Sequence, residues 1–304
     1  MMESFAGKTA VITGAGSGLG LALAHALAKE GVNLMLADVN ASDLAAAEAS
    51  VRAAVGSIEC TSTVTDVAWK GSVDALAQRT HERFGRVHLL FNNAGVAVNG
   101  PLWESTEADW QWLIGVNLLG VVYGIQAFVP KMLEHGEECH IVNTASVAGL
   151  ITPPGFSAYT VTKHAAVALS EVLFQDLRAR TTQVGVSVLC PAYFPSRISD
   201  SDRNRPSSLR NPQHDGHDGH DGETDNAVEA IVRHAVERGR LSADEIAGIT
   251  LEGIRANRFY ILPHEKIKGA IERRMQDILL DRTPTNPMAR GIAPEAPKTN
   301  GPAG

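Results

Sequence analysis

The chain has 304 residues, of which 44% are hydrophobic and 20% charged, so it is long and apolar enough to bury a sizeable core. Its formal net charge of −7 gives no electrostatic reason to bind nucleic acid or an anionic membrane surface. The three scattered cysteines indicate neither a disulfide framework nor a metal motif. With no long apolar run and no leader-like start, we expect a cytoplasmic protein without a membrane span.

Short β-branched runs alternate with longer stretches of helical period along most of the chain. The pattern predicts strands at residues 8–12, 33–37, 58–61, 87–91, 140–144 and 184–189. It predicts helices between them at residues 19–29, 41–55, 69–84, 107–133 and 157–180. The strands are apolar without clean alternation, which is typical of parallel strands covered by helices on both faces. Such strand–helix–strand units predict an α/β fold with a doubly wound parallel sheet.

A polar segment interrupts this pattern after the last of these strands. Residues 200–225 hold one large apolar side chain, Leu209, and contain the tripeptide His214-Asp215-Gly216 three times in succession. We expect a flexible flap, because so few apolar side chains cannot offset the entropy lost on ordering. Further elements are predicted at residues 227–238, 242–256 and 264–280 (helices) and 258–262 (a strand). The prediction is one domain over residues 1–282, with the flap inside it and a mobile tail at 283–304.

A glycine-rich turn joins the first strand to the first helix, and it contains Gly14, Ser17, Gly18, Leu19 and Gly20. Glycines allow a tight turn and a close approach of the backbone to a pyrophosphate, whose charge the exposed N–H groups and the helix dipole stabilise. A plain strand-to-helix turn would also suit this sequence. The strand before it, the helix after it and an acidic residue further along favour a dinucleotide site.

Asp38 is that acidic residue, about 18 positions beyond Gly20 at the end of the second strand. Its carboxylate can accept hydrogen bonds from the adenosine ribose hydroxyls of NAD, whereas it would repel the 2′-phosphate of NADP. No Arg or Lys at positions 17, 37 or 39 offsets that repulsion, so we expect NAD as the cofactor. The alternative is that Asp38 only caps the helix that begins near Ser42.

Tyr159 and Lys163 are four residues apart and therefore share one face of a predicted helix. A phenol with a pKa of about 10 is a poor base at neutral pH, but a nearby ammonium and an oxidised nicotinamide ring both favour the phenolate. Ser146 follows an apolar strand, at the carboxyl edge of the sheet where ligands bind in such folds. Its hydroxyl can hold a substrate oxygen while Tyr159 transfers the proton. The Tyr-x-x-x-Lys spacing alone can arise by chance, and the serine strengthens the assignment.

Together these motifs resemble the short-chain dehydrogenase/reductase family over roughly residues 5–200. The resemblance rests on the glycine turn, Asp66-Val67, Asn92-Asn93-Ala94-Gly95, Asn117, Ser146, Tyr159 with Lys163, and the run from Pro191 to Ser196. It implies a Rossmann-type fold in which Ser146, Tyr159 and Lys163 carry the reaction, with Lys163 also holding the nicotinamide ribose. The later part of the chain is similar to bacterial members with a long substrate loop, including aryl secondary-alcohol dehydrogenases.

The resemblance implies roles for further residues. It implies that Asn117 helps to hold a proton-relay water and that Asp66 and Val67 flank the adenine ring. It also implies that three residues line the channel for the cofactor riboses: Asn93, Ala94 and Gly95. Asn117 could instead satisfy a bend in its helix, and Asp66 could cap the following helix. Pro191 begins the last motif, where Ala192 replaces the glycine of many members, and Ser196 stands where a threonine would hold the nicotinamide carboxamide.

The segments expected around the substrate, residues 96–103, 148–156 and 192–209, are apolar and carry few charges. They contribute Val96, Trp103, Leu150, Ile151, Phe156, Tyr193 and Phe194. This composition favours an uncharged, bulky secondary alcohol or ketone, although Trp103 could equally pack against its own loop. The flap histidines invite a metal interpretation, but glycines separate them and leave no fixed geometry, so we expect no metal site.

The leading hypothesis is an NAD-dependent alcohol dehydrogenase that acts on a small molecule. An NADPH-dependent biosynthetic ketoreductase and a non-catalytic NAD-binding regulatory protein are the alternatives. The composition indicates no nucleic-acid or membrane partner. Members of the resembled family usually pair through long helices, so the resemblance implies a homodimer or homotetramer formed through residues 107–133 and 157–180.

Overall fold

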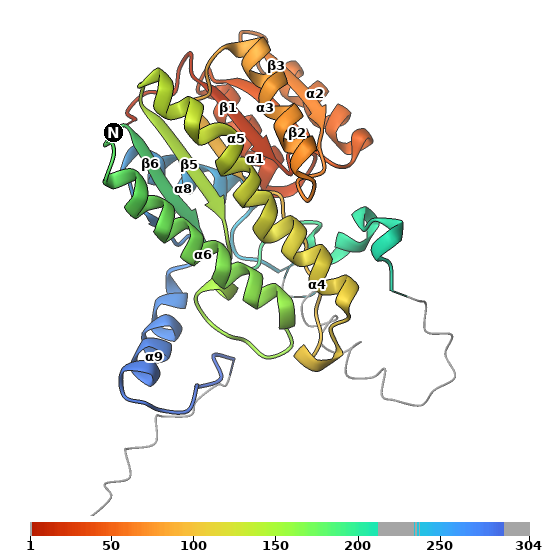
Figure 1. Ribbon diagram of the computed structural model, residues 1–304, viewed down its shortest axis with the longest axis vertical. Helices are drawn as coiled ribbons and strands as arrows, with labels where there is room; N and C mark the ends of the chain where they lie inside the picture. Colours follow the sequence, from red (N-terminus) through yellow and green to blue (C-terminus); the bar gives the residue numbers. More distant parts are fainter. Residues whose placement is uncertain (1, 212–233, 235, 237, 289–304) are drawn as a thin grey trace, which may run out of the picture.

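Seven parallel strands form the centre of the molecule (Figure 1). The computed structural model describes residues 2–211, 234, 236 and 238–288. In spatial order the strands are β3 (Cys60–Val64), β2 (Asn33–Asp38), β1 (Thr9–Thr13), β4 (Leu89–Asn92), β5 (Cys139–Thr144), β6 (Val184–Leu189) and β7 (Tyr260–Ile261). The chain order reverses between β1 and β4, and in open sheets of this kind ligands bind in the crevice at that reversal.

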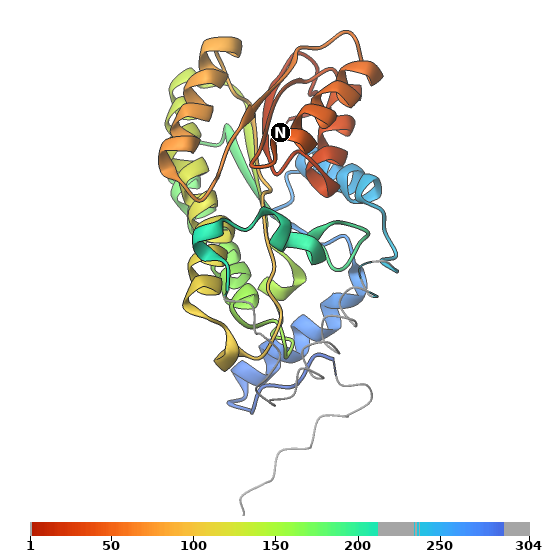
Figure 2. The same ribbon diagram turned by 90° about the vertical axis from the view of Figure 1, so that its right-hand side faces the viewer.

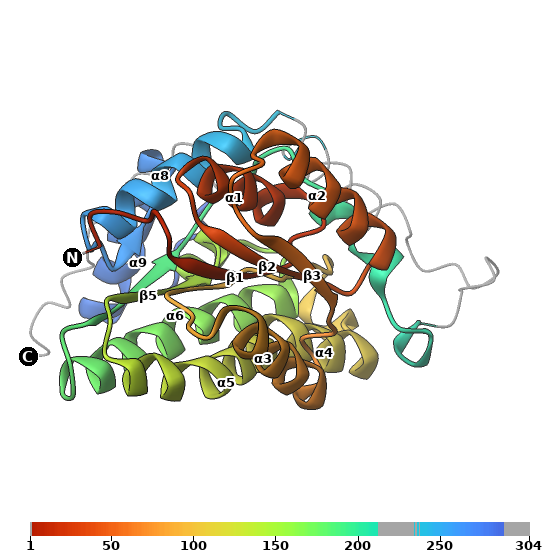
Figure 3. The same cartoon turned by 90° about the horizontal axis from the view of Figure 1, so that it is seen from above.

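Helices cover both faces of the sheet (Figure 3). One face carries α1 (Gly18–Lys29), α2 (Ala41–Ala54) and α8 (Ala243–Arg255). The other carries α3 (Lys70–Phe84), α5 (Gly120–His135) and α6 (Ser157–Arg178), and α4 (Glu107–Ile114) leads into α5. The last helix, α9 (Lys268–Leu279), lies at the lower end of the view in Figure 1. The doubly wound α/β fold predicted from the sequence is confirmed.

The apolar strands explain this layering. Every residue of β1 is buried, and successive side chains point to opposite faces of the sheet. Ile12 packs into the core beneath α1 with Leu23, whereas Val11 packs into the core on the other face with Leu76 and Phe128. A strand with apolar side chains on both faces requires cover on both sides, which the two helix layers supply.

The long helix predicted at residues 107–133 has a wide turn in its middle. α4 continues into α5 through a π-helical turn at Gly115–Leu119. By length and composition, Glu107–His135 could cross a membrane, with a mean hydropathy of 1.7. A core helix passes the same test, and Trp112, Phe128 and Met132 are buried inside the protein. We therefore interpret this helix as part of the core.

We call residues 196–211 the strap, because they cross the open end of the sheet (teal in Figure 2). The strap contains 3-10 helices at Ile198–Asn204 and Ser207–Leu209, so the first part of the predicted flap is ordered. The sequence argument weighed only apolar side chains and missed Arg205, which is buried in an ion pair with Asp109. The His-Asp-Gly repeat, most of the helix predicted at 227–238 and the tail beyond residue 288 lie outside the described residues.

Candidate active site

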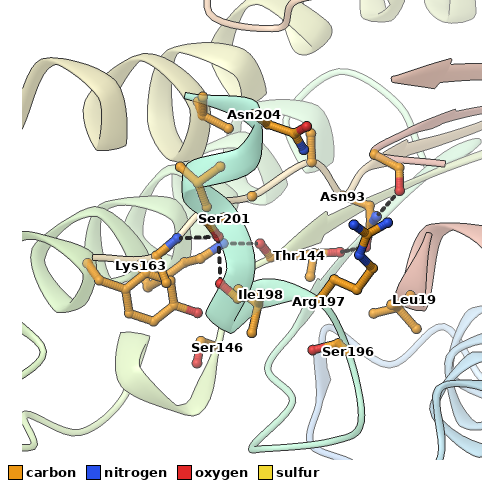
Figure 4. A pocket seen from close by; sticks show the side chains of 18 of the residues that line it. Leu19, Asn93, Thr144, Ser146, Lys163, Ser196, Arg197, Ile198, Ser201 and Asn204 are labelled. Carbon is orange, nitrogen blue, oxygen red and sulfur yellow. Dashed lines mark hydrogen bonds between the residues drawn. The ribbon is translucent and has the colours of Figure 1, made fainter. Parts of the chain in front are cut away.

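A cavity of about 640 Å³ opens at the carboxyl ends of the strands, and the strap forms one of its sides (Figure 4). Most predicted site residues line it: Gly14, Ser17, Gly18, Leu19, Asp38, Asp66, Val67, Asn93, Ala94, Gly95, Ser146, Tyr159, Lys163, Pro191 and Ser196. Gly20 and Asn117 are not in the lining, but each contacts residues that are. Motifs spread over almost two hundred residues of sequence therefore meet in one cavity.

The glycine turn packs its backbone too tightly for side chains. A Cβ atom at Gly20 would lie 2.0 Å from the carbonyl oxygen of Gly14. Gly14 itself has a φ of +66°, in the region that favours glycine. The Asn93 side chain donates to the Thr13 carbonyl oxygen at 3.0 Å and so ties the loop after β4 to this turn. The start of α1 is left facing the cavity, which suits a pyrophosphate group.

Asp38 closes β2 beside this turn. One carboxylate oxygen accepts the Gly16 N–H and the other accepts the Asn40 N–H, both at 2.9 Å. The cap of α2 is Asn40, whose side chain accepts the Asp43 N–H, so the alternative role of Asp38 as that cap is wrong. Asp38 lines the cavity and holds the glycine turn against the end of β2.

Asp66 and Val67 lie after β3 at the same end of the cavity. The Asp66 carboxylate accepts the Ala68 N–H at 2.9 Å and forms a local turn. The N-terminal cap position of α3 is Trp69, so Asp66 is not the cap of that helix. Both residues line the cavity, and a contact with adenine stays a prediction of the resemblance.

Ser146, Tyr159 and Lys163 come together in the lining of the cavity, where Figure 4 shows Ser146 and Lys163. Ser146 follows β5, and the other two lie one turn apart on α6. The Ser146 hydroxyl accepts the Ala148 N–H at 3.1 Å and lies near enough to Tyr159 to lower the pKa of its phenol. The Lys163 ammonium lies 5.7 Å from the centre of the Tyr159 ring and donates to the Thr144 carbonyl oxygen at 3.0 Å. All three residues are at least nine-tenths buried, so bulk water is largely kept from them.

Burial shifts the pKa values of both titratable groups. It lowers the pKa of Lys163 from its ordinary 10.5 to about 8. It raises the pKa of Tyr159, and the neighbouring Ser146 hydroxyl offsets only part of that rise. The sequence analysis expected a lowered Tyr159 pKa with both the lysine and an oxidised nicotinamide ring in place. In the chain by itself, desolvation by burial is the largest cause and the pKa is raised. A phenolate near neutral pH therefore requires a further positive charge in the cavity.

Asn117 lies in the π-helical turn between α4 and α5. Its amide oxygen accepts the Val96 N–H at 2.9 Å, and its amide nitrogen donates to the Val96 carbonyl and the Thr162 hydroxyl at 2.9 and 3.1 Å. A Cβ built on Gly95 would lie 3.4 Å from both Asn117 Oδ1 and Lys163 Nζ. Asn117 thus fixes the loop after β4 against α6, close to the lysine, and its side chain serves more than a bend in its own helix.

Ser196 and Pro191 belong to the loop after β6. The Ser196 hydroxyl is buried without a hydrogen-bond partner among the described residues, and its Cβ lies 3.7 Å from where a Cβ on Gly18 would be. A free hydroxyl beside the start of α1 is available to a ligand. The backbone of Ala192 donates to His264 Nδ1 at 3.1 Å. Sequence reasoning missed this anchor, because His264 lies far along the chain.

The other end of the cavity is apolar. Val96, Ile151, Phe156, Tyr193 and Phe194 line it as predicted. Trp103 does not belong to this wall and is 84% exposed, and Leu150 is also absent from the lining. Ile198 and Leu209 also line it and lie in a segment predicted to surround the substrate, although the prediction did not name them; the sequence analysis missed Trp112, Val116 and Ile267. The helical period around Trp112 and Val116 showed an apolar face, but only the fold shows that this face meets the cavity.

Arg205 anchors the strap to α4 at this apolar end. Its guanidinium lies 2.6 Å from the Asp109 carboxylate and 5.0 Å from the centre of the Trp112 ring. The Asp109 pKa is lowered although burial opposes it, because Thr106, Arg205 and Asn211 all hydrogen-bond the carboxylate. Burial makes this ion pair costly to break, so it fixes the position of the strap relative to the apolar wall.

Known proteins resemble this chain over nearly its whole length. The family model for short chain dehydrogenases matches residues 8–206. A Lactiplantibacillus plantarum protein named CLA biosynthesis dehydrogenase/reductase is 30% identical over 96% of this chain and 100% of its own length. The C alpha-dehydrogenase of a Sphingobium species is 30% identical over 91% of this chain and 87% of its own. The crystal structure of a short chain dehydrogenase/reductase from Burkholderia phymatum in complex with NAD is 46% identical, with a TM-score of 0.89 over 95% of this chain and 100% of that one.

Proposed function

The chain belongs to the short-chain dehydrogenase family of oxidoreductases, and on that premise we propose that it transfers a hydride between NAD and a bulky, uncharged secondary alcohol or ketone. One observation carries the proposal. Ser146, Tyr159 and Lys163 are buried together between a glycine-rich end and an apolar end of the same cavity. The first end suits a dinucleotide and the second an apolar substrate.

The three central residues supply the proton chemistry. NAD, when bound, accepts or supplies the hydride. Ser146 and Tyr159 are neighbours in the cavity lining, so both hydroxyls can hold the oxygen of one alcohol or ketone. Tyr159 takes the hydroxyl proton during oxidation and returns it during reduction. Lys163, held by the Thr144 carbonyl, favours the phenolate through its positive charge.

The cofactor end supports NAD as the dinucleotide. A Cβ at Gly20 would fill the space that the turn needs, and the Ser196 hydroxyl beside Gly18 has no partner among the described side chains. Both features fit a bound dinucleotide. The Asp38 carboxylate lines this end and favours ribose hydroxyls over a 2′-phosphate. The NAD complex of the Burkholderia phymatum relative supports the same choice.

The apolar end supports a substrate with a large uncharged body. Phe156 and Tyr193 form a tilted ring pair with centres 6.3 Å apart, and Trp112 lies in the same lining. Of the cations in the described lining, Lys163 belongs to the proton chemistry, Arg203 is tied to carbonyl oxygens within the strap, and Arg197 lies at the glycine turn. The described part of the apolar end therefore offers no free cation to an anionic substrate. Aromatic walls of this kind favour aryl or long alkyl groups beside the carbinol carbon.

NADH formation across a panel of aryl and alkyl secondary alcohols tests this proposal. In the Tyr159→Phe variant, kcat should fall by about a thousandfold while the Kd for NADH changes little, because only the proton acceptor is lost. Tyr260→Phe is the matched control, since that hydroxyl lies outside the cavity and bonds Glu171. Turnover retained in Tyr159→Phe would remove Tyr159 as the base. NAD binding without turnover on any alcohol would favour a regulatory protein, and a higher kcat/KM with NADPH would favour a ketoreductase.

We also propose that the protein forms a homodimer or homotetramer. Val161 and Val172 lie on one side of α6 and are 48% and 60% exposed. Exposed apolar side chains in line along a helix are typical of an interface. Light scattering should give two or four times the mass of the chain, and a monomer at micromolar concentration would contradict this.

A further inference from the structure

Arg197 lies where the strap passes the glycine turn. It follows Ser196, whose Cβ is 3.7 Å from a Cβ position on Gly18. Its guanidinium reaches the Asp43 carboxylate at 3.0 Å, and the Asp43 Cβ is 3.1 Å from a Cβ position on Gly16. The side chain therefore spans the glycine turn from Gly18 to Gly16. Arg197 also lines the cavity beside that turn (Figure 4).

The present partners of Arg197 hold it weakly. Asp43 and Asp200 face it at 3.0 and 3.5 Å, and the Arg197 side chain is 49% exposed. Ion pairs with this exposure are weak because water screens them. A pyrophosphate, which carries two negative charges, would compete well for the same guanidinium beside the turn, since charge-assisted bonds to phosphate are stronger.

Among the described residues, the other cations of the cavity are already engaged. Lys163 donates to the Thr144 carbonyl near the middle of the cavity. Arg203 donates to the carbonyl oxygens of Arg197 and Asp200, at 3.0 and 2.8 Å, so it is tied within the strap. Of the described cations in the cavity lining, Arg197 can therefore reorient toward the glycine turn with the least loss of ion-pair stabilisation.

We propose that Arg197 binds the pyrophosphate of the dinucleotide, exchanging its ion pairs with Asp43 and Asp200 for the phosphate oxygens. This rests on the proposed NAD dependence. Because Arg197 belongs to the strap, the exchange also fastens the strap over the bound cofactor. The adenosine 2′-phosphate of NADP has the same chemistry, but the carboxylates of Asp38 and Asp43 stand together at that side of the turn and disfavour it.

Direct binding measurements test the proposal without turnover. We expect Arg197→Gln to weaken the binding of NADH and of ADP-ribose about tenfold. The affinity for adenosine should stay unchanged, because adenosine has no pyrophosphate. Arg197→Lys should recover part of the loss, and the wild-type affinity should fall more steeply with salt than that of Arg197→Gln. Arg210→Gln, a matched charge change on the exposed part of the same strap, should leave all affinities unchanged.

Asp43→Asn separates ligand binding from a structural role. If Arg197 is released to bind phosphate, Asp43→Asn should keep or raise the affinity for NADH while Arg197→Gln lowers it. Equal losses in the two variants would mean that the ion pair only supports the fold. An unchanged NADH affinity in Arg197→Gln, or a loss confined to NADPH, would also overturn the proposal. A wild-type protein that binds neither NADH nor ADP-ribose would instead refute the proposed function.

Discussion

The two ends of the cavity are built in different ways. At the cofactor end, backbone turns at the ends of β1, β2 and β3 line the cavity, and Gly20 leaves no space for a side chain. At the apolar end, α4, the segment before α6, the strap and the segment before α9 contribute side chains from distant parts of the chain. The shape of the cofactor end is set by the backbone itself. The shape of the apolar end is set by a few contacts, between residues far apart in the sequence, that hold loops in place. We expect the first to tolerate little change and the second to set substrate choice.

The sharpest test of this contrast is Gly20→Ala. The new methyl group would meet the Gly14 carbonyl oxygen, so α1 must shift away from the turn. We expect the Kd for NADH to rise about a hundredfold, since close backbone approach is what the turn provides. Gly248→Ala on α8 is the control, because nothing lies within 4 Å of its Cβ position. Normal NADH titration by the Gly20→Ala protein would show that the turn has more freedom than its packing suggests.

Asp38→Asn tests whether the carboxylate at the cofactor end sets the preference for NAD over NADP. The amide oxygen can keep one of the two backbone hydrogen bonds, while the charge that repels a 2′-phosphate disappears. The ratio of kcat/KM for NADP to that for NAD should rise by at least about tenfold. Steady-state kinetics with both cofactors measures it. If the ratio stays the same while both values fall, Asp38 acts only by holding the turn.

Arg205→Met tests the apolar end alone. Removing the guanidinium leaves the buried Asp109 carboxylate without its charge partner and frees the strap from α4. We expect KM for the best alcohol of the panel to rise about tenfold, as misplaced positioning residues do. The Kd for NADH should change much less, because Arg197 meets the glycine turn at the other end of the strap. Arg210→Met is the matched control on the exposed strap surface. Equal losses in alcohol and NADH binding would mean that the two ends are not independent.

Lys163→Met, in the part of the cavity between the two ends, should abolish turnover. Its effect on the free energy of unfolding should be small. Because the pKa of Lys163 is about 8 in the fold and 10.5 ordinarily, burying its ammonium costs stability below pH 8. That cost disappears as the pH rises from about 8 to 10.5. The variant should therefore gain about 1 kcal/mol in the free energy of unfolding at neutral pH, and less in alkali. Urea unfolding at the two pH values measures this, and a loss of stability would show that the bond to Thr144 outweighs burial.

The same contrast explains what could be predicted from the sequence. The glycine turn, Asp38, Ser146, Tyr159 and Lys163 were recognisable because each role depends on residues at most about 18 positions apart in the sequence. The parallel sheet was recognisable because its strands are apolar on both faces.

The apolar end was predicted less well. Trp103 turned outward and Trp112 inward, which no local pattern distinguishes. The order of the strap depends on Arg205 meeting Asp109, almost a hundred residues earlier in the chain. The direction of the Tyr159 pKa shift depends on how deeply the fold buries the phenol, and spacing alone does not report burial.

The π-helical turn at Gly115–Leu119 separates two parts of one long helix that have different roles. An inserted residue normally rotates everything beyond it by about 100°, but a wide turn absorbs the extra residue where it stands. Trp112 before the turn and Phe128 after it can therefore face different neighbours, the cavity and the sheet core. Related enzymes could therefore gain or lose residues in α4, before the π-helical turn, and acquire a new substrate specificity. The packing of α5 against the sheet would stay unchanged.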